Sequence, residues 1–326
     1  MILPYTTRLL CLCFATFFVV HAASSLLVRS LSSTAVRAAE TMKPRRSSRL
    51  LFALRIAPVA VTLFLVLGFC VPSYVWLEPD IAGERVGLAC LLAAALGAAA
   101  WTTSLLRGAV SVIRTRRYIR NCGSSSREAA ASAGTPELLV VGETNAVMAV
   151  AGVLHPRLLV SQDVMNALSE EQKEAAFRHE AAHGVSRDNL KRLLFLLSPD
   201  VLPFVRTFSS LESGWARFTE WAADDAAVDG NQSRALSLAS ALVRVAKLGV
   251  HTTPSYLLSS LVDTDRDLAT RVDRLLREPE YAAKPLAPLV AMTRNIALIV
   301  GGVAVTLLLW PESLGSVHRI LEQLVQ

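Results

Sequence analysis

Two histidines and a glutamate stand at a spacing suited to metal-dependent hydrolysis. His179, Glu180 and His183 form the pattern H-E-x-x-H inside a stretch that predicts a helix. Positions i and i+4 share one face of a helix, so both imidazoles can face one metal ion. Glu180 adjoins the first of them and can reach a water held by that metal as a general base. The pattern predicts one zinc ion per chain.

The third protein ligand must come from another element, because two histidines and a water leave tetrahedral zinc one ligand short. Glu220 and Asp224 are spaced i, i+4 on a second predicted helix. We predict that Glu220 binds the metal. We expect Asp224 to hydrogen-bond a ligand histidine and so to fix its tautomer and orientation.

Two further charged residues have alternative roles. Asp188 either forms a surface ion pair with Lys191 or Arg192 or bonds near the metal ligands. Arg271 either contacts the oxyanion of the transition state or forms a salt bridge with Asp267 on a helix surface, which is the simpler interpretation.

The elements that must position these residues are predicted to be mostly helical. Ser169 and Gln172 have the spacing of a capping box, which predicts a helix start there, and Ser198-Pro199-Asp200 ends that helix at about Leu197. The other expected elements are strands at 137–141, 146–153 and 157–161 and helices at 212–229, 235–248 and 263–277.

The composition indicates a membrane protein. Hydrophobic residues make up 52% of the 326, but aromatic residues only 6%. The excess is therefore aliphatic, which is typical of membrane segments. The net charge is +6. The basic residues cluster beside apolar segments, which is the distribution that the positive-inside rule describes for membrane proteins. We expect a lipid bilayer as partner and no nucleic acid. The five cysteines lack metal-type spacing.

Three to four apolar runs are long enough to cross a bilayer. They lie at about 9–28, 56–76, 86–106 and 286–310. The first is either a cleaved signal peptide, with Val20–Ala22 as the cleavage site, or an uncleaved helix. The basic residues that follow it favour the helix.

Basic flanks predict the orientation and the domains. Arginines and lysines gather at 29–50 and 107–120, so both stretches should lie in the cytoplasm. The expected order is an N-terminal membrane region (1–120), a linker (121–136), a zinc domain (137–285), a membrane helix (286–310) and a tail (311–326). We therefore expect a mainly α membrane protein whose helical zincin domain carries a small β-sheet or hairpin. It should sit in the plasma or inner membrane with several passes.

At its ligand residues the chain resembles the gluzincin-type integral membrane metallopeptidases. Their pattern, H-E-x-x-H-x-x-x-x-D and then E-x-x-x-D, falls here on His179, Glu180, His183, Asp188, Glu220 and Asp224. Residues 145–161 resemble the family's edge strand, and residues 271–275 match its R-[IV]-x-x-L helix. The chain is closer to the BlaR/MecR-type antirepressor peptidases than to the HtpX-like family, which inserts membrane helices between the histidines and the glutamate. No large sensor domain follows the last apolar run, so the resemblance implies no β-lactam sensing.

The resemblance implies a zinc endopeptidase with Glu180 as its base. Its substrate would be a protein or peptide, held by strand addition along the strand near residues 146–153, with Ala146, Val147 and Ala149 as contacts. Regulatory signalling and membrane-protein quality control are the expected settings. One alternative is a non-catalytic membrane signalling or scaffold protein that retains the zinc fold. Another is a sensor whose proteolysis a regulatory partner triggers.

Overall fold

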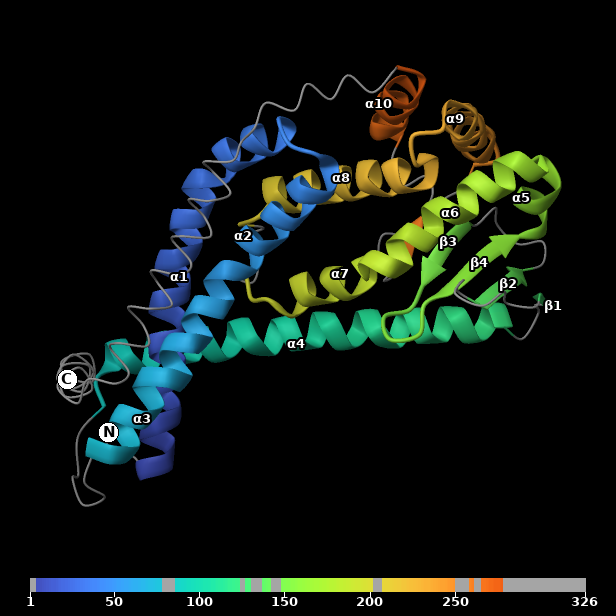
Figure 1. The fold of residues 1–326 in the computed structure, drawn as a ribbon. Helices are drawn as coiled ribbons and strands as arrows, with labels where there is room; N and C mark the ends of the chain where they lie inside the picture. Colours follow the sequence, from blue (N-terminus) through green and yellow to red (C-terminus); the bar gives the residue numbers. More distant parts are fainter. Residues whose placement is uncertain are drawn as a thin grey trace.

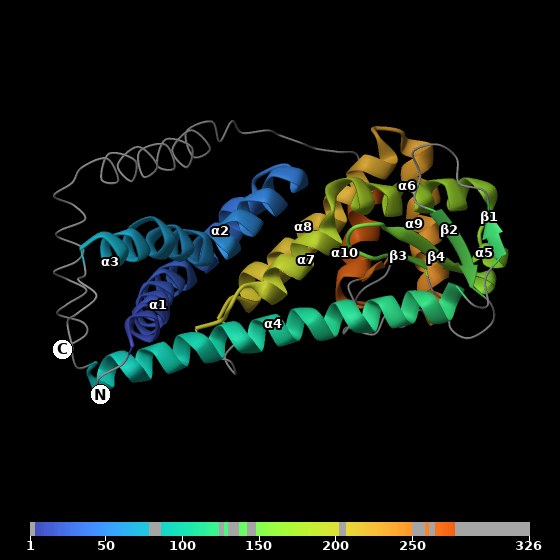
Figure 2. The same cartoon turned by 90° about the horizontal axis from the view of Figure 1, so that it is seen from below.

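The computed structural model describes residues 4–77, 86–123, 127–129, 137–141, 148–201, 207–249, 258–260 and 265–277. These residues form a mainly helical molecule with one small sheet (Figure 1). The long N-terminal helices converge at one end, and the sheet lies at the other, with helix α4 running between the two ends (Figure 2). The expected fold class, a mainly α membrane-type protein with a small sheet, is confirmed.

Three helical segments in the described residues are long and apolar enough to cross a membrane. They are α1 (Tyr5–Glu40), the continuous series α2 (Pro44–Leu65), η1 (Val66–Cys70) and α3 (Val71–Leu77), and α4 (Leu88–Gly123). The spans expected at 9–28 and 56–76 lie within them, and the span expected at 86–106 begins two residues before α4. The run at 286–310 and the tail lie outside the described residues.

These helices continue well beyond their apolar spans. The basic stretch 29–50 is largely helical, because α1 continues to Glu40 and α2 begins at Pro44. Helix α4 likewise extends into the expected linker at 121–136, where strand β1 (Arg127–Ala129) also lies. Hydropathy marks only the apolar part of a helix, because charged residues such as arginine and lysine are themselves good helix formers.

Helices α1 and α4 cross in close contact at Gly97. A Cβ atom on Gly97 would overlap the backbone oxygen of Phe14. Small residues permit such close helix packing, as the Ala- and Gly-rich composition of this span predicts.

The sheet has the strand order β1-β2-β4-β3-β5. Strands β2 (Glu137–Val141), β3 (Met148–Ala151) and β4 (Arg157–Ser161) occur where the sequence predicts strands, and β5 (Leu258–Ser260) was not predicted. β2 and β4 are parallel, and the other pairs are antiparallel. One face packs against the end of α4, and the other against helices from the second half of the chain.

The second half of the chain forms helices α5 (Gln162–Ala167), α6 (Glu170–Ser186), α7 (Asp188–Leu197), α8 (Ser209–Val228), α9 (Gln232–Lys247) and α10 (Asp265–Leu276), of which all but α7 contribute to the core under the sheet. The capping box that opens α6 is present, since Ser169 and Gln172 each accept from the backbone N–H of the other. The predicted helix to Leu197 is two helices, because Arg187 adopts a left-handed conformation between α6 and α7.

Helices α7 and α8 join the sheet end of the molecule to the membrane-type helices. α8 packs against α2, and α7 packs against α4 (Figure 1). An apolar cluster that includes Leu51, Phe195, Phe208, Leu211 and Trp215 fills this junction. The two groups of helices therefore share a core and are not separated by a flexible connection.

Candidate metal centre

The two histidines of the H-E-x-x-H pattern face one another on α6, as the i, i+4 spacing predicts. The Nε2 atoms of His179 and His183 lie 3.1 Å apart. Both side chains are buried, with 0% and 1% of their residue surface exposed. Two imidazoles therefore present their outer nitrogens to one small space away from bulk water.

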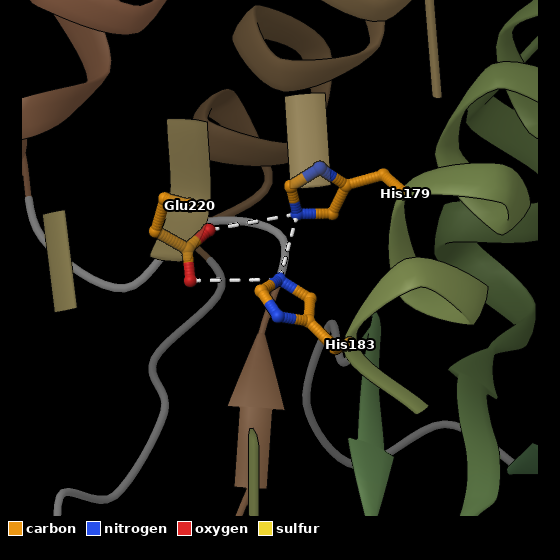
Figure 3. A group of neighbouring side chains, drawn as sticks. All are labelled: His179, His183 and Glu220. Atoms are coloured by element: carbon orange, nitrogen blue, oxygen red, sulfur yellow. Dashed lines mark hydrogen bonds and ion pairs between the residues drawn. The ribbon is translucent and has the colours of Figure 1, made fainter. Parts of the chain in front are cut away.

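Glu220 of α8 faces the same space (Figure 3). Its Oε2 atom lies 3.5 Å from Nε2 of His179, and its Oε1 atom lies 3.6 Å from Nε2 of His183. Ligand atoms placed about 2.0–2.1 Å from a tetrahedral zinc ion are about 3.3 Å from one another. The three observed separations match that spacing, so His179, His183 and Glu220 could hold a metal ion.

The opposite nitrogen of each imidazole faces a carboxylate. Nδ1 of His179 lies 2.9 Å from Oδ1 of Asp224, and Nδ1 of His183 bonds to Oδ2 of Asp188 at 2.9 Å. A carboxylate at Nδ1 favours the tautomer whose proton is on that nitrogen, which leaves a lone pair on Nε2. Positive charge near these donors is supplied in part by Arg271, whose Nη2 atom lies 3.5 Å from Nε2 of His179 and whose Nη1 atom lies 3.1 Å from Oε2 of Glu220. A proton on an imidazole or a metal ion could supply more.

Asp188 reaches His183 because α6 ends at Arg187. On a continuous helix, residues five apart point about 140° away from each other. The left-handed conformation of Arg187, with φ of 55°, redirects the chain and brings Asp188 back to the imidazole. Asp188 also pairs with Lys191 at 2.8 Å. Asp188 is buried, so this pair is not the surface ion pair considered in the sequence but an addition to its contact with the ligand histidine.

Charges around the centre favour a bound cation. Burial opposes the charged imidazolium, but Glu220 and Asp188 raise the pKa of His183 to about 10. Burial also opposes the charged carboxylate of Glu220, yet His183 and Arg271 hold its pKa well below the usual range. A site that raises the proton affinity of an imidazole in this way also attracts a metal ion, which displaces the proton on binding.

Glu180 lies beside the centre and is buried, with 0% exposure. Its Oε2 atom accepts a hydrogen bond from the backbone N–H of Val150 at 3.2 Å, while Oε1 has no hydrogen-bond partner among the described residues. Burial raises the pKa of Glu180 to about 7. A carboxyl group with that proton affinity suits general acid–base catalysis near neutral pH.

Arg271 of α10 belongs to the site and is not on a helix surface. It is 3% exposed and donates to both Asp224 oxygens, from Nε at 2.9 Å and from Nη2 at 2.7 Å. Its Nη1 atom lies 3.1 Å from Oε2 of Glu220. This bidentate pairing orients Asp224, which in turn faces His179. The surface position that the simpler interpretation gave to Arg271 is therefore wrong, while the side chain of Asp267, its expected partner, lies outside the described residues.

Asn189 is a site neighbour that the sequence reasoning missed. Its amide donates to the backbone oxygens of Val150 and Gly152 at 2.9 and 3.0 Å. This contact fastens α7 to strand β3 beside Glu180. An asparagine next to Asp188 offers no distinctive sequence signal, and only the return of the chain after Arg187 brings it to the strand.

Strand β3 is not the edge of the sheet that the resemblance implied. Ala149 is buried and pairs with Leu159 of β4 on one side and with Ser260 of β5 on the other. A substrate strand could pair with β3 only if β5 left. Ala146 and Val147, the other two expected substrate contacts, lie outside the described residues. Strand β5 comes from a part of the chain about 110 residues away, which no local pattern reveals.

Comparison with known proteins does not assign the chain to a family. No protein-family model matches the chain, and no curated protein shows significant similarity to it. The resemblance to membrane metallopeptidases therefore rests on the residues of the site alone.

Proposed function

We propose that this chain is a membrane-anchored zinc endopeptidase of the gluzincin type. One observation carries the proposal. Two imidazole nitrogens and a carboxylate lie 3.1 to 3.6 Å apart, and a carboxylate faces the far side of each imidazole. Glu180, the proposed general base, is buried beside these residues.

Zinc fits this donor set better than other common metals. Two imidazoles and one carboxylate are a frequent three-residue set for catalytic zinc, with the fourth position open. Magnesium and calcium prefer six or more oxygen ligands. Oε1 of Glu220 is buried and accepts no hydrogen bond from the described residues, while Oε2 lies 3.1 Å from Nη1 of Arg271, so Oε1 is the oxygen left for a cation.

The residues of the chain would divide the work of amide hydrolysis. His179, His183 and Glu220 would hold zinc, which when bound lowers the pKa of a water molecule and polarises a carbonyl group. Glu180 would accept a proton from the attacking water and return it to the leaving amine. Asp188, Asp224 and Arg271 would keep the ligand side chains in position.

The membrane helices support a substrate that reaches the bilayer surface. We propose a protein or peptide substrate, such as a regulator or a segment of a membrane protein, cut on the cytoplasmic side. The support is the basic composition of the stretches at 29–50 and 107–120, which the positive-inside rule assigns to the cytoplasm.

The decisive experiment compares the wild type with the Glu180→Gln variant. Both proteins should contain about one zinc ion per chain, because Glu180 is not a ligand. The variant should hydrolyse casein-like and membrane-protein substrates about 10²- to 10⁴-fold more slowly, since it lacks the base. Elemental analysis and cleavage rates measure the two quantities. Equal rates in a zinc-loaded pair would show that the site is not a peptidase centre.

A second candidate is a non-catalytic or partner-activated membrane signalling protein that keeps a structural metal. Strand β5 favours it, because β5 already pairs with the strand that would hold an extended substrate. Zinc bound without any activity would indicate the non-catalytic form. Activity that appears only with a binding protein would indicate the partner-activated form. Substrate trapping with Glu180→Gln would identify what the protein holds.

A further inference from the structure

One short turn between α7 and α8 is bound by a side chain from each of the three membrane-type segments. The turn is Ser198–Asp200. His21 of α1 donates from Nε2 to the Pro199 oxygen at 3.0 Å. Arg55 of α2 donates from Nη1 to Ser198 Oγ at 3.0 Å. Arg107 of α4 donates from Nη1 to Asp200 Oδ2 at 3.1 Å.

Arg55 makes the most contacts. It is 2% exposed and donates from Nη2 to the Phe195 and Ser198 oxygens, at 3.3 and 3.4 Å. These oxygens belong to the last turn of α7 and the residue after it, where carbonyls lack partners within the helix. Its Nε atom donates to Glu212 in the first turn of α8 at 2.7 Å. Arg55 therefore joins the end of one helix to the start of the next.

A buried charge is costly to desolvate and is retained only with full pairing. Arg55 has that pairing, and its guanidinium also lies 4.4 Å from the ring centre of Phe208. Apolar side chains alone could hold α7 and α8 against the membrane-type helices. The charged contacts add a fixed geometry, because a guanidinium with several acceptors tolerates little rotation.

Both helices joined by Arg55 carry residues of the candidate metal centre. Helix α7 begins with Asp188, which binds His183, and with Asn189, which binds β3. Helix α8 carries Glu220 eight residues after Glu212, which corresponds to about 12 Å along a helix. A shift of the turn relative to α6 would therefore move Glu220 and Asp188 relative to the two histidines.

We propose that Arg55 and the Ser198–Asp200 turn couple the membrane helices to the metal centre. In this arrangement Arg55 is a positioning residue for Glu220. A change in the packing of α1, α2 and α4 passes through the turn to α7 and α8 and alters the affinity for the metal. The proposal rests on the proposed metal site but not on peptidase activity.

The test uses the full-length protein in lipid nanodiscs and measures its dissociation constant for zinc by chelator competition. Arg55→Lys keeps the charge but loses the multiple donor geometry, and Glu212→Ala removes the acceptor on α8. Each should weaken zinc binding about 3- to 30-fold, the range of typical coupling energies. The visible spectrum of the cobalt(II)-substituted protein should change in both variants, since it reports the arrangement of the ligands.

Arg217→Ala is the matched control. Arg217 also ties α8 to α1, through a 2.9 Å contact with Glu40 at the surface, but exposed ion pairs contribute little. Its zinc affinity should stay within about twofold of the wild type. Unchanged affinity and spectrum in Arg55→Lys and Glu212→Ala would overturn the coupling while leaving the metal site intact. A wild type that binds no metal would overturn the metal site and the coupling together.

A second measurement needs no variant. Coupling is reciprocal, so zinc should slow amide hydrogen exchange in residues 195–201 of the wild type, although no ligand lies there. Zinc-induced protection confined to α6 and the ligand-bearing part of α8 would contradict the proposal.

Discussion

At the residue scale, the orientation of the two histidines is the main support for a metal site. Asp224 and Asp188 face the Nδ1 atoms, so each imidazole turns its Nε2 atom toward the other imidazole and toward Glu220. Two histidines on a solvated helix surface would not each face a buried carboxylate at Nδ1. They would also not both face a further buried carboxylate, here Glu220, at Nε2. The carboxylates that orient the ligands are thus as diagnostic as the ligands themselves.

This reasoning predicts the effect of Asp224→Asn. The amide cannot stabilise the proton on Nδ1 of His179 as a carboxylate does, and it weakens the pairing with Arg271. Zinc affinity should therefore fall about 10- to 100-fold, measured by chelator competition. Asp225→Asn is the control, because the neighbouring Asp225 pairs with Arg274 and its side chain is 39% exposed. Similar losses in both variants would mean that a general change of charge, and not the contact with His179, sets the affinity.

At the element scale, the break between α6 and α7 decides whether Asp188 belongs to the site. Arg187 has φ of 55° and ψ of 44°, a left-handed conformation that strains residues with a Cβ atom. The strain is confined to Arg187, and the contact between Asp188 and His183 that this conformation permits offsets it. A straight helix through residue 187 would carry Asp188 and Asn189 away from the histidines and from β3.

Substitutions at Arg187 test the break. Arg187→Gly should change the free energy of unfolding by less than about 0.5 kcal/mol, because relief of the left-handed strain offsets the greater freedom of glycine in the unfolded chain. Arg187→Val should lower it by about 1 kcal/mol, since a β-branched residue fits this conformation poorly. Thermal unfolding in detergent compares the two. A more stable valine variant would contradict the role of the left-handed residue.

At the scale of the whole molecule, the metal centre joins parts of the chain that are far apart. It takes ligands from α6 and α8, and Arg271 adds α10. α8 in turn packs against α2. A metal bound only to the folded chain stabilises all of these contacts at once, because the unfolded chain cannot assemble the ligands.

Removal of the metal should therefore destabilise the entire fold. With zinc at about 100 times its dissociation constant, binding contributes about 2.7 kcal/mol, so chelation should lower the unfolding temperature of the wild type. A Glu220→Gln variant should unfold at nearly the same temperature with or without chelator. If chelation shifts the variant as far as the wild type, the stabilising metal binds somewhere other than this centre.

The sequence by itself determined the candidate ligand residues and most of the local elements. Spacing on a helix places His179 and His183 on one face, Glu220 and Asp224 on another, and the capping residues start α6 where predicted, because these relations depend only on neighbours within a few residues. The apolar runs also predict the membrane helices, though not their true lengths.

Only the tertiary structure decided the rest. It placed Arg271 against Asp224 and Glu220, put β5 beside β3, and brought Arg55 to the turn between α7 and α8. Each of these contacts joins residues separated by about 45 to 145 positions. Their formation depends on which buried charged groups and backbone groups pair when the whole chain packs. No pattern of neighbouring residues contains that information.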